Sequence, residues 1–363
     1  MGAGLFLMAE MLDIPIVTMM LVALVPALLF FISVLFSVHF ESKREGLGAV
    51  PAGEIPAFRQ FTAIGVWAPL LVPFVCLLSL IIIGYSVGYS ALIAITALVA
   101  IRLLKCRGLG DLRATGRMFL KTLDDMAEPL VTLAVMVAVA GLLVGVINIV
   151  SIGTKFSELV LAVGQGSQFL SLILAGGLVI LIGMGMPTTA AYVLAASVIT
   201  FALQNVGLSE LQAHMFVFYF ATLSAITPPV CTAVFVAAGI ADAPWLSVAG
   251  QTIRIAVVKY LLPFAFVLQP ALLLEGTTGE AAIAMVSAVA GAILLSAGFA
   301  GYLVTTLTRV ERVCIGILGA VTMLSGWAVG LVAVATVAAI QLLRLRKHAP
   351  FAVLPSTDAK ERQ

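Results

Sequence analysis

A segment rich in glycine, proline and threonine interrupts the long apolar stretch 169–203. It consists of Gly183, Met184, Gly185, Met186, Pro187, Thr188 and Thr189. The glycines permit close backbone approach and positive φ, and Pro187 is expected to end the incoming helix and to preset φ for the next one. Thr188 and Thr189 are placed to cap the outgoing helix, whose N-terminal amides favour anions. The unpaired carbonyls of Gly183–Met186 and the threonine hydroxyls are hard oxygen donors suited to a desolvated cation. The alternative interpretation is a packing kink built from small residues.

A second interruption lies in the apolar stretch 214–240. It consists of Ser224, Ala225, Ile226, Thr227, Pro228, Pro229 and Val230. The two prolines lack amide protons, so the carbonyls one turn earlier, near Ser224 and Ala225, lose their donors. The hydroxyls of Ser224 and Thr227 lie beside them. Taken alone this is equally a proline kink, but together with the first interruption it is predicted to form the facing half of one site.

Helices that stop inside a bilayer leave backbone groups that lipid cannot satisfy. Such an interruption persists only where protein, water, an ion or a substrate occupies it. Two of them in one chain indicate a transport site, following the logic of discontinuous helices in secondary transporters.

Composition excludes a soluble protein. The chain has 363 residues, of which 62% are hydrophobic and 10% charged, and its mean hydropathy is +1.20. Soluble domains carry about 25% charged residues, so an all-α polytopic membrane protein is predicted. Motifs of hydrolases, metalloproteases and nucleotide-binding loops do not occur, so the chain is expected not to be an enzyme and to draw on an ion gradient. A net charge of +2 gives no reason to expect a nucleic-acid partner. A channel or a membrane enzyme is disfavoured, because neither a polar pore-lining helix nor a catalytic constellation is present.

Membrane spans need about 20 apolar residues. The predicted spans are Ile14–Phe36, Phe61–Ile83, Val87–Leu104, Val131–Ile152, Ile255–Leu274 and Ala281–Val304. The stretch Val313–Leu343 is too long for one crossing and predicts a short hairpin folded at Ser325-Gly326. The amphipathic segment Gly108–Met126 is expected to lie along the membrane interface. The stretch 169–203 is expected to enter the membrane and return.

Basic residues predict the orientation. They concentrate between residues 43 and 59, between 102 and 121, and from 309 onward, whereas the loops 153–168 and 275–280 hold one lysine and no arginine. The basic loops and the C-terminus are therefore expected to be cytoplasmic. Lys259, near one end of its predicted span, is expected to snorkel. His214 is expected to be interfacial rather than a ligand.

An internal echo suggests a repeat. Residues 1–15 align without gaps on residues 230–244, at an offset of 229. The alignment pairs Phe6 with Phe235, Ala9 with Ala238, Asp13 with Asp242 and Pro15 with Pro244. Because secondary transporters are often built from two repeats, residues 1–13 are predicted to end the broken helix of a first repeat. The rest of that repeat is expected upstream, which would make the chain the C-terminal part of a longer protein. The alternative is a non-transporting membrane fragment that needs an upstream partner chain.

Three segments resemble a known family: GMGMPTTAAY (183–192), HMFVFYFATLSAITPPV (214–230) and LLPFAFVLQPALLLEG (261–276). They resemble the large membrane subunit of tripartite ATP-independent periplasmic (TRAP) transporters, closest to fused permeases partnered by the TAXI type of binding protein. The resemblance implies a sodium-coupled elevator transporter of the bacterial inner membrane with two inverted repeats, each holding a re-entrant hairpin and a broken helix. It also implies an organic-anion substrate, a periplasmic solute-binding protein, a small membrane subunit, and no cofactor besides Na+.

The resemblance assigns roles along the chain. Residues 1–13 would end the first-repeat broken helix, 14–126 would hold connecting spans, 127–276 the second repeat with hairpin 169–203 and broken helix 214–240, and 277–363 the C-terminal spans and basic tail. Substrate and ion contacts would come from the two interruptions. Sodium is expected at Gly183, Gly185, Thr188, Ser224 and Thr227.

Overall fold

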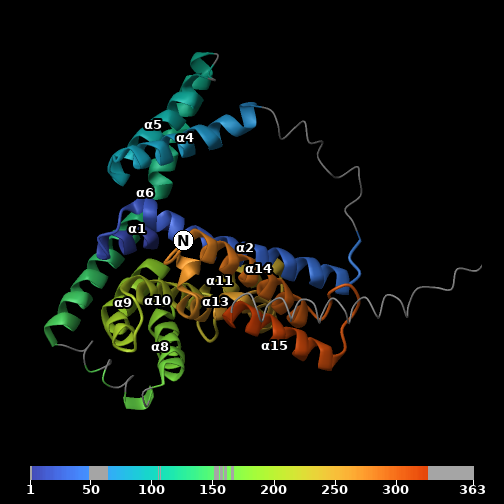
Figure 1. Ribbon diagram of the computed structural model, residues 1–363. Coiled ribbons are helices and arrows are strands. Elements are labelled where there is room, and N and C mark those ends of the chain that lie inside the picture. The colour runs from blue at the N-terminus through green and yellow to red at the C-terminus, as the bar shows by residue number, and fades with distance from the viewer. Residues whose placement is uncertain are drawn as a thin grey trace, which may run out of the picture. The chain divides into compact units, whose positions relative to one another are not determined.

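The computed structural model describes residues 2–48, 64–104, 106, 108–150, 155, 158, 162–164 and 167–325 (Figure 1). Every regular element in these ranges is helical, apart from an isolated bridge between Tyr302 and Thr306. The chain divides into two compact units. The first runs to Ala27 and from Leu47 to Ile253, and the second comprises Leu28–Gly46 and the residues from Arg254 onward. The predicted all-α class is confirmed.

Four helical segments of the described chain are long and apolar enough to cross a membrane. They are α2 (Ile16–Arg44), α5 (Val87–Leu104), the α12–α13 segment Trp245–Leu268, and α14 (Thr278–Ala300). The chain is therefore a multi-pass membrane protein. The bounds of α5 are those predicted, and α4 (Ile64–Ile83) precedes it through a turn in which Gly84 has φ of +103°.

In the first unit α10 (Glu210–Ser224) is buried among its neighbours. Besides α4 and α5, this unit contains α1 (Gly2–Met11), α6 (Leu109–Val150), α8 (Gln168–Gly183), α9 (Thr188–Asn205) and α11 (Thr232–Ala241). α8, α9 and α10 pack side by side, and α1 and α6 contact α9 (Figure 1). α10 is buried on all faces from Gln212 to Ala221. Its close packing depends on glycine, since a Cβ placed at Gly176 of α8 would lie 2.7 Å from the Phe220 ring.

α6 is longer than predicted. The amphipathic segment Gly108–Met126 and the predicted span Val131–Ile152 were expected as distinct parts, yet one helix of 42 residues runs through both as far as Val150. At 1.5 Å per residue it is about 63 Å long. Only residues 127–130 (AEPL) separate the two parts, and the helix continues through them although they include Pro129.

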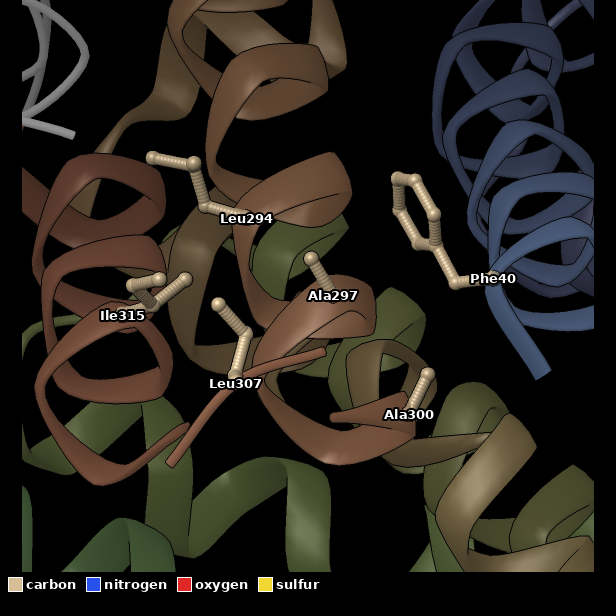
Figure 2. Packing of buried hydrophobic residues seen from close by; sticks show 6 residues of the cluster. All are labelled: Phe40, Leu294, Ala297, Ala300, Leu307 and Ile315. Carbon is tan, nitrogen blue, oxygen red and sulfur yellow. The ribbon is translucent and has the colours of Figure 1, made fainter. Parts of the chain in front are cut away.

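In the second unit α14 and α15 (Arg309–Ser325) pack most closely. Their contact is built on small residues: a Cβ at Gly291 would lie 2.7 Å from the Gly319 carbonyl oxygen, and a Cβ at Gly298 would lie 2.8 Å from the Gly316 nitrogen. A hydrophobic cluster continues this contact (Figure 2). Its residues are Phe40 from α2, Leu294, Ala297, Ala300, Leu307 and Ile315.

Further predicted spans had wrong bounds. Ile14–Phe36 begins at Ile16 and continues to Arg44 as α2. Ile255–Leu274 is divided, because α12 (Trp245–Ile255) ends where α13 (Val257–Leu268) begins, and Pro270 opens a separate 3-10 turn, Pro270–Leu273. The span Ala281–Val304 begins earlier and ends at Ala300, because Gly301 adopts φ of +80° and ends the helix. Of the predicted hairpin Val313–Leu343, the residues after Ser325 lie outside the described residues.

Lys259 lies deeper than predicted. The crossing begins at Trp245 rather than Ile255, so this lysine lies near the middle of Trp245–Leu268 rather than near an end. Its Nζ lies 5.1 Å from the centroid of the Phe30 ring. An aromatic face stabilises a desolvated cation at that distance.

Three arginines from different helices bind the C-terminal end of α14. Arg312 Nη2 donates to the Phe299 carbonyl at 2.8 Å, Arg254 Nη2 donates to the same oxygen at 3.2 Å, and Arg44 Nη1 donates to the Ala300 carbonyl at 2.8 Å. Glu41 accompanies them, with carboxylate oxygens 3.1 Å from Arg44 Nη2 and 3.9 Å from Arg254 Nη2. Cations at a helix C-terminus satisfy its free carbonyls and complement its dipole.

The internal sequence similarity between residues 1–15 and 230–244 is matched by similar backbone structure. Asp13 and Asp242 both adopt the left-handed conformation, with φ of 51° and 48°. α2 begins at Ile16 and α12 at Trp245, the same offset of 229. The flanking hydrogen bonds also correspond: Ile14 N to Ala9 O (3.1 Å) and Met19 N to Pro15 O (3.1 Å) match Ala243 N to Ala238 O (3.2 Å) and Val248 N to Pro244 O (3.2 Å). The alignment of residues 1–15 on 230–244 therefore describes a repeated helix–turn–helix structure.

Candidate functional site

The two predicted interruptions are both present, and they meet. α8 ends at Gly183, and Ser224 is the last residue of α10. The Ser224 hydroxyl donates to the Gly183 carbonyl at 3.0 Å and to the Ala221 carbonyl at 2.7 Å. A Cβ at Gly183 would lie 2.6 Å from Ser224 Oγ and 2.9 Å from Ser224 Cβ, so only glycine permits this approach. The two interruptions therefore contact each other, and that they form one site stays a prediction.

The loop between α8 and α9 touches the second interruption at a further point. Gly185 adopts φ of +76°, which favours glycine. A Cβ at that position would lie 3.6 Å from Val230 Cγ1. The loop is held by two backbone bonds, from Met184 N to Leu181 O at 3.4 Å and from Met186 N to Gly183 O at 3.3 Å.

Pro187 does not end the incoming helix, and the capping role predicted for the two threonines was wrong. The incoming helix ends at Gly183, before Pro187, which instead occupies the N-cap position of α9 without a side-chain cap. Its φ of −58° and ψ of 143° suit that position, and its carbonyl accepts from Ala191 N at 3.0 Å. Thr188 and Thr189 therefore lie in the first turn of α9 and do not cap it. Their hydroxyls have no hydrogen-bond partner among the described residues, which leaves them available to a ligand.

Two of the carbonyls expected to be free are paired. Gly183 O accepts from Ser224 and Met186, and Ala225 O accepts from Ala233 N of α11 at 3.1 Å. Ala225 finds this second donor because the chain turns back at the prolines and brings the first turn of α11 to it.

Other oxygens remain free within the described part of the chain. The carbonyls of Met184, Gly185 and Met186 accept no hydrogen bond there, and neither does that of Ser224, because Pro228 lacks the amide proton that would pair it. Beside them, Thr227 Oγ1 donates to Leu223 O at 2.7 Å. The interruptions together therefore present backbone and hydroxyl oxygens from both α8–α9 and α10–α11.

His214 was predicted to be interfacial, but it is buried, with 5% of its surface exposed. Its Nδ1 and the hydroxyl of Tyr192, which is fully buried, are joined by a hydrogen bond of 2.8 Å. This bond ties α9 to α10, one helical turn beyond Thr188. Sequence reasoning missed the pair because His214 directly precedes an apolar run; a polar residue on a helix buried all round requires a partner, and that signal was available.

The donor set suits an alkali cation better than a transition metal. The described residues contain no group of three or more His, Cys, Asp or Glu placed to hold a metal ion. Backbone carbonyls and hydroxyls are hard, neutral oxygens of the kind that bind alkali and alkaline-earth ions.

A helical multi-pass membrane protein in which two interrupted helices meet has the architecture of a membrane permease. Residues 1–281 match the family model described as "Tripartite ATP-independent periplasmic transporter, DctM component". The chain belongs to this family, which is a family of transporters and not of enzymes. Comparisons with curated proteins and with solved structures returned no match.

Proposed function

We propose that the chain is the permease component of a sodium-coupled TRAP transporter that imports an organic anion, a carboxylate. The observation that carries this proposal is the contact between the two interruptions, where Ser224 Oγ lies 3.0 Å from the Gly183 carbonyl oxygen. Free oxygens lie on both sides of this contact. Family membership supports the class of transporter. The ion and the site are our inference from the oxygen donors.

Sodium would be held by oxygens of both interruptions. The candidate ligands are at Gly183, Gly185, Thr188, Ser224 and Thr227, with the Met184 and Met186 carbonyls beside them. Gly183 O already accepts from Ser224 and Met186, so it would have to release one of these bonds to bind a cation. A cation coordinated by both segments would hold the hairpin and α10 together.

The carboxylate substrate would lie at the start of α9. The helix has no side-chain cap, so the amides of its first turn can donate to an anion, and the positive end of the helix dipole favours negative charge there. A sodium ion next to it would add further attraction. Thr188 and Thr189 lie between the two positions and could contact either.

The partners in this proposal are a periplasmic solute-binding protein of the TAXI type and a small membrane subunit. The protein would be located in the bacterial inner membrane and operate by an elevator movement of two inverted repeats, with residues 127–276 forming the second. The repeated structure around Asp13 and Asp242 supports the presence of two related halves.

Replacing Thr188 and Thr189 by valine is expected to reduce sodium-dependent uptake by about tenfold or more, because each hydroxyl bonded to an ion contributes about 1.5–3 kcal/mol. Valine has nearly the same shape, so membrane expression should not fall. The measurement is carboxylate uptake into proteoliposomes that contain the protein with its partner subunits, over a sodium titration. Ser197→Ala serves as a control on the same helix, since within the described chain its hydroxyl bonds only the Leu194 carbonyl. If uptake by the double variant matched that of wild type at every sodium concentration, Thr188 and Thr189 would not belong to the site.

The proposed orientation, with basic loops inside, predicts that Thr277→Cys is labelled by a membrane-impermeant maleimide in intact cells and that Gly110→Cys is labelled only after lysis. Both positions are exposed at helix starts, so reactivity depends on the side of the membrane. Labelling should be done with the four native cysteines replaced. The reverse pattern would invert the topology.

A further inference from the structure

The second unit contains an open groove of about 650 Å³ between α13, α14 and α15. Pockets that hold small molecules have volumes of about 300–1,000 Å³. One wall belongs to α15 and consists of Arg309, Arg312, Val313, Gly316, Ile317 and Ala320. A Cβ at Gly316 would meet nothing within 4 Å, so there is open space beside the middle of this α15 wall.

The groove has the length and polarity of a lipid. Its α15 residues recur every three or four positions and form one helix face, which extends about 16 Å from Arg309 to Ala320 at 1.5 Å per residue. The hydrocarbon region of one leaflet is about 15 Å thick, half of a 30 Å core. Both charged residues of the groove are arginines at the same end, and the remainder is apolar, with Val313 and Ile317 60% and 59% exposed.

The cationic end lies where a lipid headgroup would be. Arg312 donates through Nε to Gly298 O at 3.3 Å and through Nη2 to Phe299 O at 2.8 Å, in the last turn of α14. That helix is a candidate span ending at Ala300, so the arginine is placed at the end of a crossing. The apolar part of the groove runs back along the crossing, as an acyl chain would.

Donors remain free at this end. Arg309 is exposed and makes no hydrogen bond or ion pair with the described part of the chain, and Arg312 keeps Nη1 after its two backbone bonds. Guanidinium groups bind phosphate oxygens through paired, charge-assisted hydrogen bonds. No carboxylate lines the groove among the described residues.

We propose that this groove binds one anionic phospholipid, with its phosphate on Arg309 and Arg312 and an acyl chain along Val313 to Ala320. The charge of the mouth selects an anionic headgroup over a zwitterionic one, because basic residues at the surface attract anionic lipid. The site is separate from the meeting point of the interrupted helices and holds whether or not the transported ion is sodium.

Native mass spectrometry of the purified full chain with phosphatidylglycerol or phosphatidylcholine measures the selectivity. Wild type is expected to retain phosphatidylglycerol preferentially, Arg309→Gln to lower that preference by about fivefold, and Gly316→Leu to reduce binding of both lipids by filling the groove. Arg117→Gln on α6 makes the same change of charge at an exposed position and should behave as wild type. Equal retention of the two lipids by wild type, or identical behaviour of Arg309→Gln and Arg117→Gln, would overturn the proposal.

A photo-crosslinking residue at Ile317 identifies the occupant directly in membranes that contain phosphatidylglycerol. An adduct with the mass of that lipid supports the proposal. Crosslinking to the apolar residues 326–343 of the same chain, or to a second copy of the chain, would show that protein occupies the groove and would contradict it.

Discussion

Gly183→Ala is expected to abolish sodium-dependent uptake while leaving the chain in the membrane. The added methyl would lie 2.6 Å from Ser224 Oγ, 2.9 Å from Ser224 Cβ and 3.3 Å from Ala191 Cβ. Turning the serine hydroxyl away would relieve the first contact but not the second, so α8 must separate from α10. Overpacking of this kind costs about 1–3 kcal/mol, and it also moves the two sets of oxygens apart.

Gly177→Ala is the matched control for Gly183→Ala. Both glycines belong to α8, but a Cβ at Gly177 meets nothing within 4 Å. Alanine is favoured over glycine in a helix interior by up to about 1 kcal/mol, so Gly177→Ala should transport normally and be no less stable. If Gly183→Ala took up substrate as Gly177→Ala does, the contact between the interruptions would not matter for transport.

Gly291→Ala is expected to destabilise the second unit, against the usual preference for alanine in helices. Its Cβ would lie 2.7 Å from the Gly319 carbonyl oxygen, 2.7 Å from Met323 N and 2.8 Å from Met323 Cβ. Backbone atoms cannot rotate away, so α14 and α15 must move apart, at a cost of about 1–3 kcal/mol. The measurement is the apparent Tm of the purified protein in detergent, which should fall by several degrees.

Gly279→Ala provides the comparison on the same helix, because a Cβ there meets no atom within 4 Å. Its Tm should equal or slightly exceed that of wild type. A normal Tm for Gly291→Ala would show that α14 and α15 do not pack through their glycines. Transport is not the readout here, since this contact lies outside the proposed ion site.

The sequence was sufficient for the positions of the interruptions but not for their internal bonding. Glycine and proline impose backbone geometry locally, so the presence of an interruption at each place follows from residue type. The end of α8 did not, because Pro187 is expected to end it whereas the helix ends at Gly183. The pairing of the Ala225 carbonyl with Ala233 depends on how the chain returns after the prolines, which no local rule specifies.

The predictions of helix ends and of burial failed where tertiary structure determines these features. Thr188 and Thr189 are good capping residues by type, but Pro187 takes the N-cap position and leaves them in the first turn. His214 was assigned to the interface from its place beside an apolar run, whereas packing of α10 among its neighbours buries it against Tyr192. The α12–α13 boundary was missed because Ala256, where it falls, carries no signal of its own.

The echo between residues 1–15 and 230–244 shows what pattern alone can yield. Four identities in an apolar alignment are weak support, yet both aspartates, Asp13 and Asp242, proved to adopt the same left-handed turn. An aspartate tolerates that conformation better than most residues do. The pair was thus the most informative part of the match.

Equilibrium binding of radioactive sodium to the purified chain tests the central claim most directly. We predict saturable binding that is displaced by excess unlabelled sodium but not by potassium. The Thr188→Val, Thr189→Val double variant should lose this binding, and Ser197→Ala should retain it. Sodium binding that does not saturate, or that the double variant retains in full, would contradict the assignment of an ion site to the meeting of the two interrupted helices.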